Sequence, residues 1–373
     1  MKMGTMMDYL DWRGDISFAT DPLNHVDNLI FAQLAYVEFD GIVPGPDSEE
    51  RMDIEEANER FWQTHTEKEV QRGKTLFHLA PMLMKKVSAS RRFKGMQLSC
   101  FTNTVSAERN EQMSAITFHL RNGMTYVAFR GTDDTLTGWK EDFYLSFLEQ
   151  SPGQRMAADY LSQRASRVEG ELYVGGHSKG GNFAVFASAF CDEAVRERIA
   201  RVYTNDGPGF FPSVIQSQGY QEILPRIISI IPEESIFGLL LDCGYPSMVV
   251  KSNNKGLWQH DAMSWGVLGN RFVEAEKVNK SSQLVEQTVE RWIARLTLEE
   301  RKQFVDTMFE IIESSGKDTI SGIQGAKLTS LLDMMGSFRH MDTQERTKMR
   351  GMLQQLLRAG AEVLRQDITE DLI

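Results

Sequence analysis

Ser178 lies in a glycine-rich stretch where a serine could act as a nucleophile. Residues 171–184 read ELYVGGHSKGGNFA, in which GHSKG (176–180) fits the pattern G-x-S-x-G. A nucleophilic serine on a tight strand-to-helix turn needs glycine two positions before and two after it, because the backbones approach closely there. Apolar residues precede the motif as in a strand and follow it as in a helix. We therefore predict Ser178 as the nucleophile and Gly176 and Gly180 as the glycines of the turn.

Two other interpretations of this stretch exist. One is a glycine-rich turn that carries no chemistry. The other is a phosphate-binding loop, which needs Gly-Lys-Ser/Thr in that order, whereas the lysine here precedes the glycines. The order of residues therefore disfavours a phosphate-binding loop.

The elements around the motif alternate between strands and helices. Asn122-Gly123 is a hairpin signal between two of the strands. The alternation predicts an α/β fold with a mostly parallel central sheet that is covered on both faces. The expected strands begin near residues 96, 115, 124, 171, 201, 226 and 247, and the expected helices span 153–166 and 181–200.

The two flanks of this core differ from it in pattern. Residues 28–37 are apolar enough for a buried helix, and the charged residues 46–73 predict an exposed helical segment. After about residue 270 the strand pattern stops, and Thr297-Leu-Glu-Glu300 is a capping box that opens a helix. We expect an N-terminal, mainly helical segment packed on the core (1–95), an α/β core (96–270) and a C-terminal helical annex (271–373).

Composition narrows the class of protein. The 373 residues are 41% hydrophobic and 25% charged, which is typical of a globular protein in water. The net charge of -11 disfavours nucleic-acid binding. One basic cluster is expected to be a solvated face or a helix end; it consists of Lys85, Lys86, Arg91, Arg92 and Lys94.

Targeting and redox signals are weak. Cys100, Cys191 and Cys243 are an odd number with no close pair, which predicts neither a disulfide framework nor a zinc site. The N-terminus lacks the apolar run of a signal peptide, and no stretch approaches the roughly 18 apolar residues of a membrane span. We expect a cytoplasmic protein with no stable membrane insertion and with no metal or other cofactor.

A second motif lies upstream of the serine, and the two together carry a resemblance. Residues 126–143 read YVAFRGTDDTLTGWKEDF. A strand ending in F-R-G-T, a loop with W-x-x-D and then G-H-S-x-G-G resemble the class 3 (fungal-type) lipases of the α/β-hydrolase superfamily. More closely, the chain resembles a bacterial family of lipase-like α/β-hydrolases that carries the label of a domain of unknown function. Its marks cover roughly residues 8–270: YLDWRGDISF (9–18), NHVDNLIFAQLAYVEF (24–39), NDGPGF (205–210), PEESIFGLLL (232–241) and GLWQHDAMSW (256–265).

The resemblance implies an α/β-hydrolase fold for the core (96–270) and roles for residues around the serine. The residue after F-R-G supplies an oxyanion-hole N–H in these lipases, which is Thr132 here, and the N–H of Lys179 is the second donor. Arg130 and Asp142 are expected to hold the loop together. The chain order Ser, acid, His leaves two histidines after Ser178. His340 lies in the helical annex, so His260, in a loop after the last strand, is expected to be the base.

The acid is less directly implied. The position that aligns with the aspartate of class 3 lipases holds Ser235. Asp206 ends the preceding strand in NDGPGF, near the carboxyl edge of the sheet where ligands bind in open α/β sheets, and pancreatic-type lipases place their aspartate similarly. We predict Asp206 as the acid, with Glu234 or its neighbour Glu233 as the alternative.

Three side features remain open at this level. The Lys179 side chain, beside the nucleophile, either favours an anionic substrate or points along the helix to solvent. His177 is expected to be structural. A lid over the site is expected from residues 46–73 or 236–248, although the apolar IFGLLL within the second stretch also fits a buried core.

These residues favour a serine hydrolase that cleaves a carboxylic ester, with a small-molecule ester or a lipid as substrate. Ser178, His260 and Asp206 would form the triad, and an acyl-enzyme would form and then be hydrolysed. An acyltransferase would use the same residues. The serine at position 235 also keeps open a non-catalytic relative that binds a ligand or partner, since a fold does not fix a function.

Overall fold

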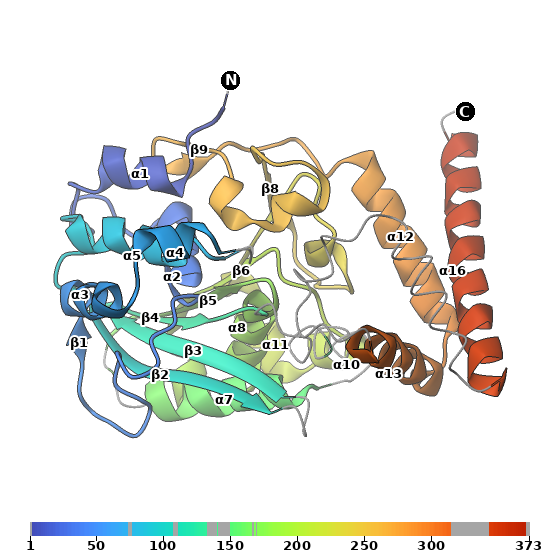
Figure 1. The fold of residues 1–373 in the computed structure, drawn as a ribbon, viewed down its shortest axis with the longest axis horizontal. Helices are drawn as coiled ribbons and strands as arrows, with labels where there is room; N and C mark the ends of the chain where they lie inside the picture. The colour runs from blue at the N-terminus through green and yellow to red at the C-terminus, as the bar shows by residue number, and fades with distance from the viewer. Residues whose placement is uncertain are drawn as a thin grey trace.

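The computed structural model describes residues 2–73, 77–106, 111–132, 140, 150–165, 168, 170–314 and 343–370. Within them, an eight-stranded sheet forms the centre of the molecule (Figure 1), and its strands follow one another in sequence order from β1 to β8. The strands are β1 (Met52–Asp53), β2 (Gln97–Ser106), β3 (Glu111–His119), β4 (Thr125–Phe129), β5 (Leu172–His177), β6 (Ile199–Asn205), β7 (Ile227–Pro232) and β8 (Ser247–Val250).

The sheet changes direction at β4. The pairs from β1 to β4 are antiparallel, and those from β4 to β8 are parallel. The predicted Asn122-Gly123 hairpin joins β3 to β4, and Gly123 has a φ of 85°, which glycine adopts readily. Helices lie between the parallel strands from β4 to β7, whereas a loop with one short 3-10 turn joins β7 to β8. The predicted α/β fold with a mostly parallel sheet and flanking helices is confirmed.

Helices cover both faces of the sheet. They are α1 (Met6–Arg13), α2 (His25–Leu34), α3 (Ile54–Thr64), α4 (Glu67–Gln71), α5 (Ala80–Ala89), α7 (Pro152–Ala165), α8 (Lys179–Phe190), α9 (Glu193–Arg196), α10 (Pro212–Ile215) and α11 (Gln218–Ile223). The helix expected over 181–200 is in fact two, because α8 ends before Cys191 and α9 starts after Asp192.

Successive residues of β4 show how the sheet separates two apolar clusters. Tyr126 and Ala128 belong to a cluster with the helices of the N-terminal segment. Val127 and Phe129 belong to a second cluster, with α7, α8 and α11. Because alternate side chains of a strand point to opposite faces, the two clusters lie on opposite sides of the sheet. This burial on both faces explains why β4 reads as a continuous apolar run.

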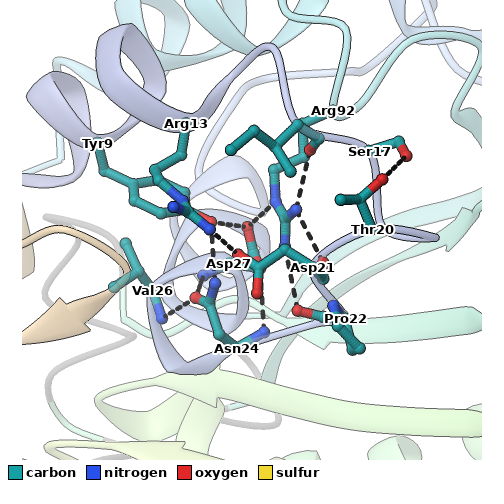
Figure 2. A network of polar contacts seen from close by, with 11 residues as sticks. Tyr9, Arg13, Ser17, Thr20, Asp21, Pro22, Asn24, Val26, Asp27 and Arg92 are labelled. Carbon is teal, nitrogen blue, oxygen red and sulfur yellow. Dashed lines mark hydrogen bonds and ion pairs between the residues drawn. The ribbon is translucent and has the colours of Figure 1, made fainter.

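A buried ion pair joins α2 to the loop after α5 within the N-terminal segment (Figure 2). Arg92 donates from Nε to Asp27 Oδ1 (2.7 Å) and from Nη2 to Asp27 Oδ2 (2.5 Å), and neither side chain is exposed. Tyr9 Oη donates to Asp27 Oδ1, and Asp27 Oδ2 also accepts from the N–H of Asn24, which caps α2. Arg92 is therefore a structural residue, and of the two expectations for the basic cluster, a solvated face or a helix end, the solvated face is wrong for it. Removing one partner would leave a buried, unpaired charge, which is strongly destabilising.

Short elements follow the sheet, and long helices end the chain. The short ones are η1 (Leu224–Arg226), η2 (Phe237–Leu239), η3 (Gly256–His260), η4 (Ala262–Ser264), β9 (Val267–Leu268) and β10 (Arg271–Phe272). The long helices are α12 (Lys280–Arg295), α13 (Leu298–Ser314) and α16 (Thr343–Glu370), and they lie to one side of the sheet in Figure 1.

The long helices have a small core of their own, built from Leu296, Met349 and Met352. Thr297 and Glu300 form the predicted capping box of α13. Among the described residues, no helix is both long and apolar enough to cross a membrane.

Candidate active site

The chain makes a strained turn at Ser178, between β5 and α8. Ser178 has φ 59° and ψ −132°, an unusual conformation for a residue with a side chain. A Cβ built on Gly176 would lie 2.3 Å from the carbonyl carbon and oxygen of Gly180, and one built on Gly180 would lie 2.1 Å from Phe129 O. Both positions therefore need glycine, because no side chain fits between these backbones. This close approach is what the spacing of the two glycines anticipated.

Three side chains from three different loops meet at this turn. His260 Nε2 lies 2.9 Å from Ser178 Oγ, and His260 Nδ1 lies 2.6 Å from Asp206 Oδ2. All three residues are buried, and Ser178 is 7% exposed. Since Asp206 accepts from Nδ1–H, the Nε2 atom is left to accept the hydroxyl proton of Ser178. This arrangement can deprotonate the serine and stabilise the imidazolium that results.

Asp206 is held by more than the histidine. Its backbone N–H donates to Ile230 O on the neighbouring strand, and its own φ is 52°. Oδ1 accepts from Ser235 Oγ (2.5 Å) and from the N–H of Gly238 (3.1 Å). The carboxylate is thus fully satisfied and aimed at His260, instead of folding back on its own turn.

Glu234, the alternative acid, binds elsewhere. Its Oε2 accepts from the N–H of Gly256 and from Gln259 Nε2 (2.9 Å), and its Oε1 accepts from Asn279 Nδ2 (3.1 Å). Gln259 in turn accepts from the N–H of Glu234. The side chain therefore braces the loop that carries His260, and it does not orient the imidazole.

The loop after β4 presses against the turn. A Cβ built on Gly131 would lie 2.5 Å from His177 O and 3.1 Å from Ser178 Cβ, so the backbones are in contact. Thr132 follows directly and is 5% exposed. Lys179 begins α8, so its N–H lies at the positive end of the helix dipole, beside Ser178. The structure thus brings Lys179, and Gly131 directly before Thr132, next to the serine turn.

The side chains of two neighbouring cations lie away from the serine. Lys179 is 1% exposed, and its Nζ donates to Gln112 Oε1 (3.0 Å), so the expectation that it points to solvent is wrong. Arg130 is buried and donates to Asn103 Oδ1 on β2 (2.8 Å), as expected of a residue that holds the loop. Trp139, Asp142 and His340 lie outside the described residues.

Residues that were given no role from the sequence also support the site. Ser235 holds Asp206, and Tyr36 Oη lies 3.1 Å from His177 Nδ1. Phe237 packs its ring against that of His260, with centroids 4.2 Å apart. The resemblance to class 3 lipases drew attention to position 235, where the acid is missing. The serine found there could have indicated a hydrogen-bond partner for the acid. Tyr36 and Phe237 lie in stretches that carry the resemblance, but no local pattern assigned either of them a role.

A cavity of about 310 Å³ lies at the same end of the sheet. Tyr36 and Arg130 line it, and Tyr36 Oη also lies 2.2 Å from the Cβ position of Gly131, next to the serine turn. Its apolar wall consists of Phe61, Val70, Phe77 and Pro81. The cavity therefore adjoins the turn, with Tyr36 between them.

Both stretches considered for a lid form backbone hydrogen bonds with the rest of the molecule. Residues 46–73 contain β1, which pairs with β2, as well as α3 and α4. In 236–248, Leu240 O and Asp242 O accept from the N–H groups of Gly209 (2.7 Å) and Phe210 (2.6 Å).

Among the described residues, no group of three or more His, Cys, Asp or Glu could hold a metal ion.

Comparison with known proteins places the chain in a family. Among solved structures, it is similar to the crystal structure of M37 lipase, with 14% identity, a TM-score of 0.33, and coverage of 57% of this chain and 68% of that chain. No match was found among curated proteins. A family model described as Mbeg1-like matches residues 87–310, which is more than half of the chain. The chain therefore belongs to the Mbeg1-like family.

Proposed function

We propose that the protein is a lipase-like serine hydrolase that cleaves carboxylic esters. The single observation that carries the proposal is the hydrogen-bonded series from Ser178 Oγ to His260 Nε2 (2.9 Å) and from His260 Nδ1 to Asp206 Oδ2 (2.6 Å). Such a series activates a serine hydroxyl, which is a weak nucleophile at its ordinary pKa.

The reaction follows from the roles of these atoms. Ser178 Oγ attacks the ester carbonyl, while His260 Nε2 takes its proton and Asp206 stabilises the imidazolium. The N–H groups of Thr132 and Lys179 donate to the oxyanion of the tetrahedral intermediate. His260 then returns the proton to the leaving alcohol, and an acyl-enzyme remains on Ser178. Water, deprotonated by His260, attacks the acyl-enzyme, and the acid leaves with the serine restored.

The cavity beside Tyr36 suggests the substrate. Four apolar side chains form one part of its wall, beside the charged Glu38, Glu69 and Arg130. The cavity adjoins the serine turn at Gly131. We propose that it takes the apolar part of a small-molecule or lipid ester, because apolar pockets bind by removing such surface from water.

The test is hydrolysis of p-nitrophenyl esters, from acetyl to palmitoyl, by the wild type and by Ser178→Ala. Labelling by a fluorophosphonate, read by intact mass, is run in parallel. We expect hydrolysis and labelling by the wild type and neither by Ser178→Ala, with unchanged circular dichroism. Failure of the folded wild type to label at Ser178 would refute the proposal.

A further inference from the structure

His177, the residue before the serine, contacts the backbone of the proposed base. Its Nε2 lies 2.9 Å from the carbonyl oxygen of His260. A carbonyl oxygen only accepts, so Nε2 carries the proton and donates it. The side chain of one strand end is thereby bonded to the main chain of a loop that lies 83 residues further along the chain.

The other ring nitrogen fixes this tautomer. Because Nε2 holds the proton, Nδ1 of the neutral ring is an acceptor, and Tyr36 Oη, 3.1 Å away, donates to it. Tyr36 comes from the segment just after α2, so a third part of the chain sets the orientation of the His177 ring. Both nitrogens of His177 are thus occupied, and neither bonds a group of the triad side chains.

Packing holds the two histidine rings against each other. Their centroids are 4.7 Å apart with an angle of 38° between the planes, and the ring of Phe237 lies 4.2 Å from that of His260. Phe77 stacks on Tyr36 with centroids 3.9 Å apart and contacts His177 edge-on at 5.4 Å. His177 is completely buried, and this burial, with His260 close by, lowers the pKa of His177 well below its ordinary value. The ring therefore stays neutral beside the histidine that must become charged.

We propose that His177, oriented by Tyr36, is a positioning residue that holds the backbone of His260 so that its imidazole stays in line with Ser178. The proposal rests on the proposed function for its effect on rate, but the positioning itself can be measured without a substrate.

The physical reason is the sensitivity of proton transfer to distance. The base must keep its 2.9 Å separation from Ser178 Oγ while it remains bonded to Asp206. If the donor at His177 is lost, the carbonyl of His260 is left buried without it, and the loop will shift to find another donor. A displacement of about 1 Å can cost about 10²-fold in rate.

The experiment compares three variants with a matched control. His177→Phe keeps a ring and removes the donor, whereas His177→Gln places an amide N–H near the position of Nε2. Tyr36→Phe removes the hydroxyl that sets the tautomer. Tyr160→Phe is the control, because it removes a buried tyrosine hydroxyl that bonds Thr117 and Cys100 O, away from the triad.

Two readouts are taken from each folded protein. One is the rate constant of fluorophosphonate labelling at Ser178, together with kcat and KM if an ester is turned over. The other is the far-downfield NMR resonance of the His260 Nδ1 proton in its short bond to Asp206, which needs no substrate. A purely structural role for His177 would change stability and leave both readouts as in the wild type.

We expect His177→Phe to label about 10²-fold more slowly and to lose or broaden the resonance. We expect His177→Gln to recover to within about tenfold of the wild type, Tyr36→Phe to fall between them, and Tyr160→Phe to match the wild type. Wild-type labelling and resonance in folded His177→Phe would overturn the proposal. If that variant does not fold, Tyr36→Phe decides by the same criteria. If the wild type itself does not label, the proposed function fails, while the resonance still decides the positioning role.

Discussion

Ser235 Oγ donates a 2.5 Å hydrogen bond to Oδ1 of Asp206, although the two residues follow different strands of the sheet. The other oxygen of this carboxylate accepts from His260 Nδ1. The position at which the resemblance to class 3 lipases would place the acid is therefore occupied by a residue that binds the proposed acid. The residue after β6 contacts the imidazole directly, and a residue after β7 holds the carboxylate that does so.

Replacing Asp206 by Asn should nearly abolish activity. The amide cannot stabilise the imidazolium and favours the wrong tautomer of His260, so we expect kcat to fall by about 10⁴-fold. Glu234→Gln should stay within about tenfold of the wild type, because its partners lie in the loop and not on the imidazole. Steady-state ester hydrolysis measures both. Equal losses in the two variants would favour Glu234 as an acid after all.

Because Ser235 lies so close to Asp206, the carboxylate can be transferred to position 235 by a double substitution. Asp206→Ser should be nearly inactive, and adding Ser235→Asp to it should recover at least tenfold, because the new carboxylate starts from a position 2.5 Å from the old one. A double variant that is folded and no more active than Asp206→Ser would show that the end of β7 cannot orient His260.

The glycines of the serine turn should not tolerate a methyl group. Gly176→Ala would place Cβ 2.3 Å from the backbone of Gly180, so we expect a loss of at least about 3 kcal/mol in the free energy of unfolding. Gly351→Ala is the matched control, because a Cβ there meets nothing within 4 Å in the middle of α16. It should be neutral or stabilise by up to about 1 kcal/mol. Urea unfolding of both variants tests this, and equal stability would argue against the close approach at the turn.

Filling the cavity should change the preferred chain length of the ester. Val70 is half-buried and lines the cavity, so Val70→Trp should lower kcat/KM for long acyl chains by about tenfold or more and leave acetyl esters nearly unchanged. Val285→Trp, on an exposed part of α12, is the control. A chain-length profile identical to the wild type would exclude this cavity as the acyl site.

Buried His119 should make the protein less stable in mild acid. Burial, helped by the charge of Arg51, lowers the pKa of His119 to about 4, below the value of about 6.5 in an unfolded chain. Between these values the unfolded chain binds more protons, so stability falls as the pH drops from about 6.5 to about 4. From pH 7 to pH 5 this amounts to about 2 kcal/mol. Urea unfolding should show a smaller fall for His119→Gln, whose amide can keep the contact with Ser99.

Asp261 changes stability with pH in the opposite direction to His119, so the two effects must be measured separately. Burial raises the pKa of Asp261 to about 6, so the folded chain binds more protons between about pH 4 and 6, and this contribution to stability is lost as the pH rises. Asp261→Asn should therefore steepen the acid-induced loss that His119→Gln reduces. If both variants followed the wild type at every pH, neither group would control acid stability.

The sequence predicted those parts of the site that depend on local geometry. The tight turn at Ser178 follows from glycines two residues away on either side, and the strand ending in Asp206 follows from its apolar run and its Asn-Asp-Gly-Pro turn. The position of His260 after the last strand of the main sheet followed from the chain order that the resemblance implies. These predictions needed no knowledge of distant neighbours.

The remaining features depend on residues that are far apart in the chain. Lys179 is buried because Gln112, 67 residues away, accepts from it, and nothing in its own helix indicates this. Tyr36 reaches His177 across 141 residues. Cys191 and Asp192 interrupt the helix expected over 181–200, because the chain must turn there to bring α9 and β6 back to the sheet. Such contacts are set by the packing of layers, which a local pattern does not encode.

The order of the strands also determines when the site can be completed during synthesis. Each strand of the main sheet pairs with the one before it in the chain, so the sheet can be assembled stepwise as residues leave the ribosome. Ser178 emerges first, Asp206 follows, and His260 comes only after all eight strands. A nascent chain therefore carries the serine turn for some 80 residues without its base. On the proposed mechanism, the nascent chain becomes catalytically active only after all eight strands of the sheet have been synthesised.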